Sequence, residues 1–84
     1  QNFNLNIVPN PAKNHITLTL NLEPGDSGIA QIIDIKGREV DRIKVQSGQS
    51  EYLIQTSKWK NGEYFIHLKT DKSLIANGRF IIQK

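Results

Sequence analysis

Apolar residues alternate with polar ones along much of this chain, and a period of two restricts it to β-structure. The alternation is clearest over residues 16–22 (ITLTLNL) and 64–69 (YFIHLK), and it also occurs over residues 3–7 (FNLNI). Successive side chains of a strand point to opposite faces, so this pattern predicts half-buried strands. An amphipathic helix needs a period near 3.6, and no window holds that period for more than about a turn.

Turn-forming residues separate the apolar runs at regular intervals. They occur at residues 9–11 (PNP), 23–26 (EPGD), 36–37 (KG), 47–48 (SG), 61–62 (NG) and 70–72 (TDK). Glycine allows the positive φ of tight turns, and proline fixes φ while removing a ladder donor. About seven short strands, spaced by roughly 8–12 residues, predict an all-β, antiparallel β-sandwich of Ig-like type.

Three local features refine this expectation. Residues 29–35 (IAQIIDI) carry apolar side chains on both faces, which predicts a central strand covered on each side. Residues 40–45 (VDRIKV) slip in phase between Val40 and Ile43, which indicates a bulge. We expect Gly37 and Gly62 to adopt the positive φ of tight hairpins.

Length and composition narrow the possible functions. The 84 residues suffice for one domain, residues 1–84, and cysteine is absent. The net charge of +3 is scattered, with acidic residues close to most basic ones, whereas nucleic-acid binding needs a contiguous basic face. No run approaches the roughly 20 apolar residues of a membrane span, and no signal peptide opens the chain. We therefore expect no nucleic-acid partner and no membrane insertion. If the domain is exported, we expect the export signal to lie upstream, on a longer secreted precursor.

Candidate catalytic and metal-ligating residues are few. Two histidines, His15 and His67, fall short of the three or four ligands that zinc takes. No serine or threonine lies in a nucleophile motif, and the glycines are isolated turn residues. We expect no catalytic residue, no metal and no cofactor, and hence no enzyme. Trp59 is a possible carbohydrate contact if the chain is instead a sugar-binding or fibronectin-like spacer module.

The order of the turns along the chain resembles a known family. Residues 8–12 (VPNPA) come first, and residues 32–40 (IIDIKGREV) follow the first alternating strand. Residues 59–66 (WKNGEYFI) come next, and residues 80–84 (FIIQK) close the sequence. In this order the chain resembles the type A C-terminal sorting domain of the type IX (Por) secretion system of Bacteroidetes.

The resemblance implies a folded secretion signal. Such a domain directs a cargo through the type IX outer-membrane translocon and is recognised by the translocon and shuttle proteins. A sortase-like peptidase then cleaves it off as the cargo passes from the periplasm to the cell surface or the medium. The residues that match the family, or that we expect to be recognised, are Pro9, Asn10, Pro11, Gly37, Val40, Gly62, Tyr64, Phe80, Ile81, Ile82 and Lys84. We expect recognition to centre on the last strand and the Gly62–Tyr64 hairpin, because an open strand edge can pair with a partner.

Overall fold

Strands account for all the regular structure that the computed structural model assigns in residues 5–72 and 75–84, the part of the chain it describes. In chain order they are β1 (Leu5–Val8), β2 (His15–Leu20), β3 (Ser27–Asp34), β4 (Glu39–Gln46), β5 (Glu51–Gln55), β6 (Gly62–Thr70) and β7 (Ile75–Ile82). The prediction of seven short strands is confirmed. Phe3, expected to begin the first strand, lies outside the described residues.

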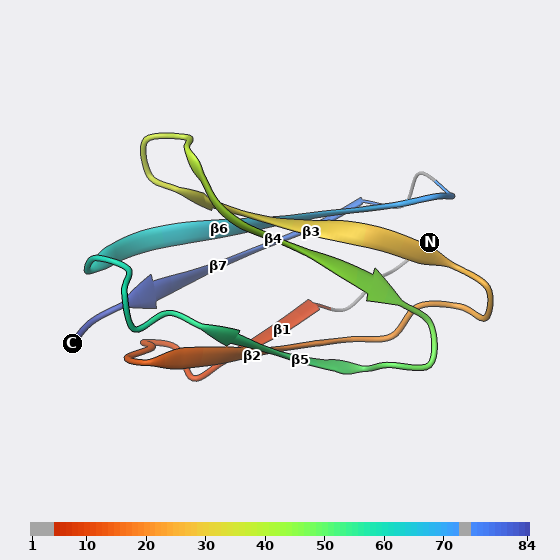
Figure 1. The fold of residues 1–84 in the computed structure, drawn as a ribbon, viewed down its shortest axis with the longest axis horizontal. Coiled ribbons are helices and arrows are strands. Elements are labelled where there is room, and N and C mark those ends of the chain that lie inside the picture. Colours follow the sequence, from red (N-terminus) through yellow and green to blue (C-terminus); the bar gives the residue numbers. More distant parts are fainter. Residues whose placement is uncertain (1–4, 73–74) are drawn as a thin grey trace.

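The strands form two stacked sheets, as Figure 1 shows. One sheet has the order β1-β2-β5, the other has the order β4-β3-β6-β7, and all neighbouring strands are antiparallel. The predicted antiparallel sandwich is confirmed, and the arrangement is consistent with an Ig-like fold.

The inner faces of the two sheets supply the core. Ile16, Leu18 and Leu20 project from β2, as their alternation predicts, and all three are buried. On the facing sheet Tyr64, Ile66 and Leu68 of β6 are buried in the same way. Full burial of an aliphatic side chain of this size contributes about 1.5–3 kcal/mol, so these strands hold the layers together. The core also contains Ala12, Ala30, Ile32, Val45, Tyr52, Ile54, Ala76, Phe80 and Ile82.

Strand β3 is central in its sheet, but it is covered on only one face. It pairs with β4 on one side and with β6 on the other, as predicted. Its outward side chains are open to solvent, however, and Ile29 is 38% exposed. The expectation that residues 29–35 would be covered on both faces is therefore wrong. A sandwich has two layers, so the outer face of each sheet has no layer to cover it.

The predicted bulge in residues 40–45 is confirmed, and it falls at Val40. Ile32 of β3 faces Asp41, but the next residue, Ile33, faces Glu39. Val40 is thus the extra residue on β4, and 36% of it is exposed. Bulges commonly redirect a side chain in this way.

Because successive strands run in opposite directions, alternate connections gather at the same end of the sandwich. Residues 9–14, 35–38, 56–61 and 83–84 lie together at the left of Figure 1, beside the C-terminus. We call this the C-terminal end. Gly62 lies here with a positive φ of 148°, as expected, but the predicted hairpin at Asn61 and Gly62 is wrong. The connection instead crosses between sheets, because β5 pairs with β2 whereas β6 pairs with β3 and β7.

Candidate functional site

The first turn of the chain closes onto the last strand. Pro9 and Pro11 cannot donate to a ladder, so β1 ends at Val8 and the chain turns toward β7. There the Asn10 Oδ1 atom accepts a hydrogen bond from the Ile81 amide at 3.0 Å. The Ala12 amide donates to the Ile81 carbonyl at 2.7 Å, and the Ala12 carbonyl accepts from the Gln83 amide at 2.9 Å.

These bonds occupy the outer edge of β7 over its last residues. The expectation of an open strand edge at residues 80–84 is wrong, because the outward backbone groups of Ile81 already have partners in Asn10 and Ala12. A segment that resembles an extra parallel strand, bridging Ala12 to Ile82, covers this edge. Covering an edge is a common protection against unwanted strand pairing.

Lys84 ties the chain's last residues to the connection between β5 and β6. Its ammonium donates to the carbonyl oxygens of Ser57 at 2.6 Å and Trp59 at 2.7 Å. Its backbone amide donates to Oδ1 of Asn61 at 3.1 Å. The basic residue that matches the family at this position thus has a structural role in this chain.

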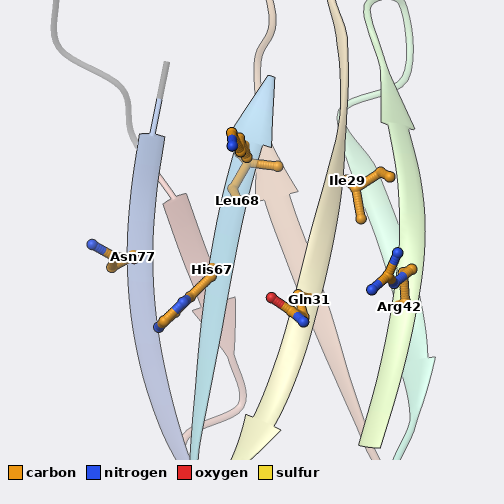
Figure 2. A pocket seen from close by; sticks show the side chains of 7 residues that line it. Ile29, Gln31, Arg42, His67, Leu68 and Asn77 are labelled. Atoms are coloured by element: carbon orange, nitrogen blue, oxygen red, sulfur yellow. The ribbon is translucent and has the colours of Figure 1, made fainter. Parts of the chain in front are cut away.

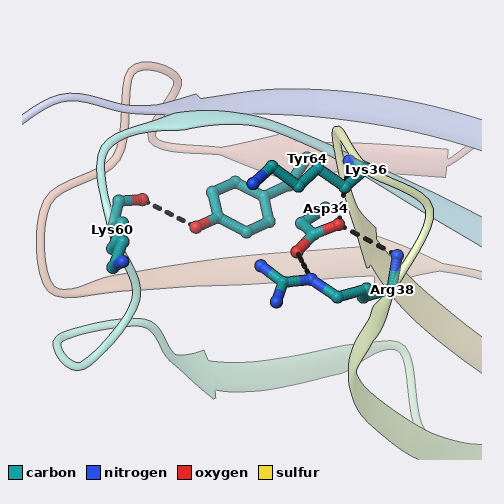
Figure 3. Close-up of polar contacts among 5 residues, drawn as sticks. All are labelled: Asp34, Lys36, Arg38, Lys60 and Tyr64. Atoms are coloured by element: carbon teal, nitrogen blue, oxygen red, sulfur yellow. Dashed lines mark hydrogen bonds and ion pairs between the residues drawn. The ribbon is translucent and has the colours of Figure 1, made fainter.

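Three aromatic rings pack in a row near the hydrogen bonds of Lys84. The centroids of Trp59 and Tyr64 are 5.5 Å apart with a tilt of 33°, and those of Tyr64 and Phe80 are 5.6 Å apart and nearly parallel. The Tyr64 hydroxyl donates to the Lys60 carbonyl at 2.6 Å (Figure 3). Burial, followed by the nearby Asp34 carboxylate, raises the pKa of the Tyr64 hydroxyl above its ordinary value. Trp59 is half-buried against the core, so packing explains its position without a sugar ligand.

Asp34 organises the hairpin between β3 and β4. Its Oδ1 atom accepts from the amides of Lys36 and Arg38, both at 2.9 Å, and its Oδ2 atom pairs with the Arg38 Nε at 3.0 Å (Figure 3). The Arg38 amide, with help from its guanidinium and from the Lys36 amide, lowers the pKa of the Asp34 carboxyl. Gly37 has a φ of 86°, which confirms the positive φ expected there.

Most residues expected to be recognised meet at this end. Asn10 and Ile81 are bonded to each other, Tyr64 stacks on Phe80, and Gly62 begins β6 opposite Ile82. Two residues that organise the end, Asp34 and Asn61, were missing from the predicted set. An aspartate three positions before a turn glycine was an available signal for Asp34, because such side chains bond to the amides that follow. No comparable signal marks Asn61, whose partner is distant in the sequence.

A hollow lies on the outer face of the four-stranded sheet (Figure 2). It is open, holds about 380 Å³, and includes Gln31, His67 and Asn77 among its lining residues. Its arginine, Arg42, is paired with Glu39 at 2.9 Å, and this bond raises the pKa of Arg42 while lowering that of Glu39. Within the described ranges, no three His, Cys, Asp or Glu side chains are placed to hold a metal ion, and no helix could span a membrane.

The geometry so far defines a small β-sandwich whose distinctive end is built from turns, strand ends and backbone hydrogen bonds. Over residues 6–83 the sequence matches the family described as the secretion system C-terminal sorting domain, and the chain belongs to that family. No curated protein matches the chain.

Membership of this family gives the chain its class of function. It is a C-terminal sorting signal of type IX secretion, a non-catalytic class of domain. Its action involves the type IX secretion machinery, and its cargo is a secreted or cell-surface protein.

Proposed function

We propose that residues 1–84 are a single sorting domain from a longer secreted precursor, recognised by the outer-membrane translocon and its shuttle proteins. The observation that carries this proposal is the match over residues 6–83, which covers β2 to β7 in full and all of β1 except Leu5. In this scheme the cargo reaches the periplasm through a signal on its precursor, and the domain then directs it across the outer membrane.

Recognition centres on the C-terminal end. The residues that match the family converge there, and their backbone is held by Asn10, Asn61 and Lys84. Since the edge of β7 is occupied at Ile81, the partner contacts side chains and turn surfaces rather than adding a strand at that point. Ile81 itself remains 46% exposed through its side chain, so it is available for such contact.

After export, a sortase-like cysteine peptidase removes the domain at a bond upstream of β1. The cargo is then attached to the cell surface or released. In this reaction the domain is the substrate. The covered edge at the end of β7 favours a domain that keeps its shape until it is removed.

Export of a reporter tests this function. The reporter carries an N-terminal signal peptide and residues 1–84 at its C-terminus, and it is expressed in a Bacteroidetes strain with a working type IX system. We expect it at the cell surface or in the medium, and we expect retention in a strain that lacks the translocon. Periplasmic retention in both strains, with the domain shown to be folded by protease resistance, contradicts the proposal.

A surface substitution locates the recognised region. Removing residues 80–84 would also remove Phe80 and Ile82 from the core, so export could fail through unfolding. Ile81→Asn leaves the backbone bonds of that residue in place and should reduce export. Leu53→Asn, at an exposed apolar site on the other sheet, is the matched control and should export normally. Equal export of both variants would show that the last strand is not contacted.

A further inference from the structure

Acidic and basic residues are mixed along the sequence, but in the connections between strands the fold places them at opposite ends of the domain. The four segments of the C-terminal end contain six basic residues, Lys13, Lys36, Arg38, Lys58, Lys60 and Lys84, and no acidic residue. At the opposite end, the described connections between strands carry Glu23, Asp26 and Asp71 with a single basic residue, Lys72. The connections between strands are therefore basic at the C-terminal end, which we call the basic pole, and acidic at the opposite end.

A hollow of about 340 Å³ lies at this basic pole. It is lined by Ile35, Lys36, Val40 and Lys60, together with Asp34, Arg38, Glu63 and Tyr64. The two acidic side chains of the hollow are already paired, Asp34 with Arg38 at 3.0 Å and Glu63 with Arg79 at 3.3 Å. In the part of the chain that the structure describes, the ammonium groups of Lys36 and Lys60 have no ion-pair partner.

Apolar side chains flank these cations without contributing to the core. Ile35 is 66% exposed and Val40 is 36% exposed, and neither belongs to the core. A single exposed apolar residue is ordinary, but two beside unpaired cations in one hollow make a combined apolar and cationic surface. That surface complements a chain segment that carries both carboxylates and an apolar side chain.

We propose that this hollow docks an acidic, apolar-bearing protein segment of the secretion machinery. The inference rests on the proposed function and adds the chemistry of the partner. Carboxylates of the segment pair with Lys36 and Lys60, and its apolar side chain covers Ile35 and Val40. An anionic lipid surface would satisfy the cations equally well, but a hollow with apolar walls fits a projecting side chain better than a flat layer of headgroups. We therefore commit to a protein segment.

Peptide binding tests the docking chemistry directly. The probe is a 12-residue peptide of alternating glutamate and leucine, with a peptide of alternating serine and leucine as its control. Binding to residues 1–84 is followed through Trp59, the chain's single tryptophan, which stacks on a residue that lines the hollow. We expect the acidic peptide to bind, the control peptide to bind at least about tenfold more weakly, and the affinity to fall with salt.

Matched variants separate the hollow from overall charge. Lys36→Glu combined with Lys60→Glu should weaken binding of the acidic peptide by about tenfold or more. Lys44→Glu combined with Lys72→Glu changes the net charge equally at sites away from the hollow and should have little effect. Ile35→Asn should also weaken binding, whereas Leu53→Asn should not, although these two side chains are 66% and 63% exposed. Equal effects of the two members of either pair overturn the proposal.

Two further outcomes also overturn it. The first is that the wild-type chain fails to bind the acidic peptide. The second is that it binds phosphatidylglycerol vesicles more strongly than the peptide, which would indicate a membrane partner.

The reporter assay separates this inference from the proposed function. If the wild-type fusion is exported and the Lys36→Glu, Lys60→Glu fusion is exported equally, the docking site is wrong and the sorting function stands. If the wild-type fusion is itself retained, the sorting function fails first.

Discussion

Replacing Tyr64 by phenylalanine isolates one hydrogen bond at the C-terminal end. The ring is 5% exposed and stacks between Trp59 and Phe80, and phenylalanine preserves these contacts. The change removes the hydroxyl that donates to the Lys60 carbonyl at 2.6 Å. A hydrogen bond of this kind contributes about 0.5–1.5 kcal/mol. We therefore expect a loss of about 1 kcal/mol, or roughly 4–8 °C in Tm for a domain of this size.

The same substitution makes a prediction about alkaline pH. Burial and then the Asp34 carboxylate raise the pKa of Tyr64 in the folded protein, so the folded state favours the neutral hydroxyl. The pKa of tyrosine in the unfolded chain is about 10, and below that pH the wild type keeps the whole of the stability that Tyr64 contributes. As pH rises further, toward the raised pKa of the folded protein, this stability is lost. The wild type therefore loses stability above about pH 10 through Tyr64, by at most about 1.4 kcal/mol per pH unit, and the variant lacks this loss.

Urea unfolding of both proteins at pH 7, 9, 10 and 11 measures the effect. All other titrating groups are common to the two proteins, so the difference in their free energies of unfolding reports on Tyr64 alone. We expect the advantage of the wild type to stay constant up to about pH 9 and to shrink above pH 10. A difference that is the same at all four pH values would refute the argument that burial disfavours the Tyr64 phenolate.

Three other changes test the fold and its turns. Gly28→Ala should destabilise by about 1–3 kcal/mol in thermal unfolding, because the added Cβ would clash with the backbone of Lys69 and Thr70; an unchanged Tm would show that the strands move apart freely. Asp34→Asn should lower stability at neutral pH. The deficit should shrink as pH falls from about 4 through the lowered pKa of the folded carboxyl, because the carboxylate is then protonated; a deficit that is the same at pH 7 and pH 2 contradicts this. Lys84→Met should lower the free energy of unfolding by less than about 1 kcal/mol but speed amide hydrogen exchange over residues 56–61. Lys44→Met is the control and should not change that exchange. Equal exchange in the two variants would show that the Lys84 ammonium does not hold residues 56–61 in place.

Much of the sandwich could be predicted from local pattern alone. Alternation over residues 16–20 and 64–68 identified the inward faces of β2 and β6, since strand geometry fixes which side chains share a face. The phase slip at Val40 located the bulge for the same reason. These features depend only on residues that are close together in the sequence, so the local pattern is enough to predict them.

Errors arose where the outcome depended on distant partners. Alternating apolar residues cannot show whether a second layer covers a face, and the outer face of β3 is open although residues 29–35 are apolar on both sides. The Asn-Gly pair at residues 61–62 is typical of hairpins, but the pairing of β5 with β2 makes it a crossover. The open edge expected at the last strand is occupied by Asn10 and Ala12, which lie some 70 residues earlier in the chain.

Contacts between residues far apart in the sequence also limited the prediction of the candidate site. Family resemblance identified most of its residues, but it gave no reason for their grouping. That reason is the alternating strand direction, which brings the turns before β2, β4 and β6 to one end of the molecule. The basic pole was missed for a related reason, because its cations come from four segments that are far apart in the sequence and meet only in the fold.

The bond from Asn10 to Ile81 spans 71 positions, and it makes assembly of the C-terminal end depend on the presence of β7. During translation the first turn leaves the ribosome long before its partner exists. Phe80 and Ile82 are also missing from the core until the last residues emerge. A chain that stops short within β7 therefore cannot close this end. The surface at this end thus needs both the first turn and β7, and a chain truncated within β7 cannot display it.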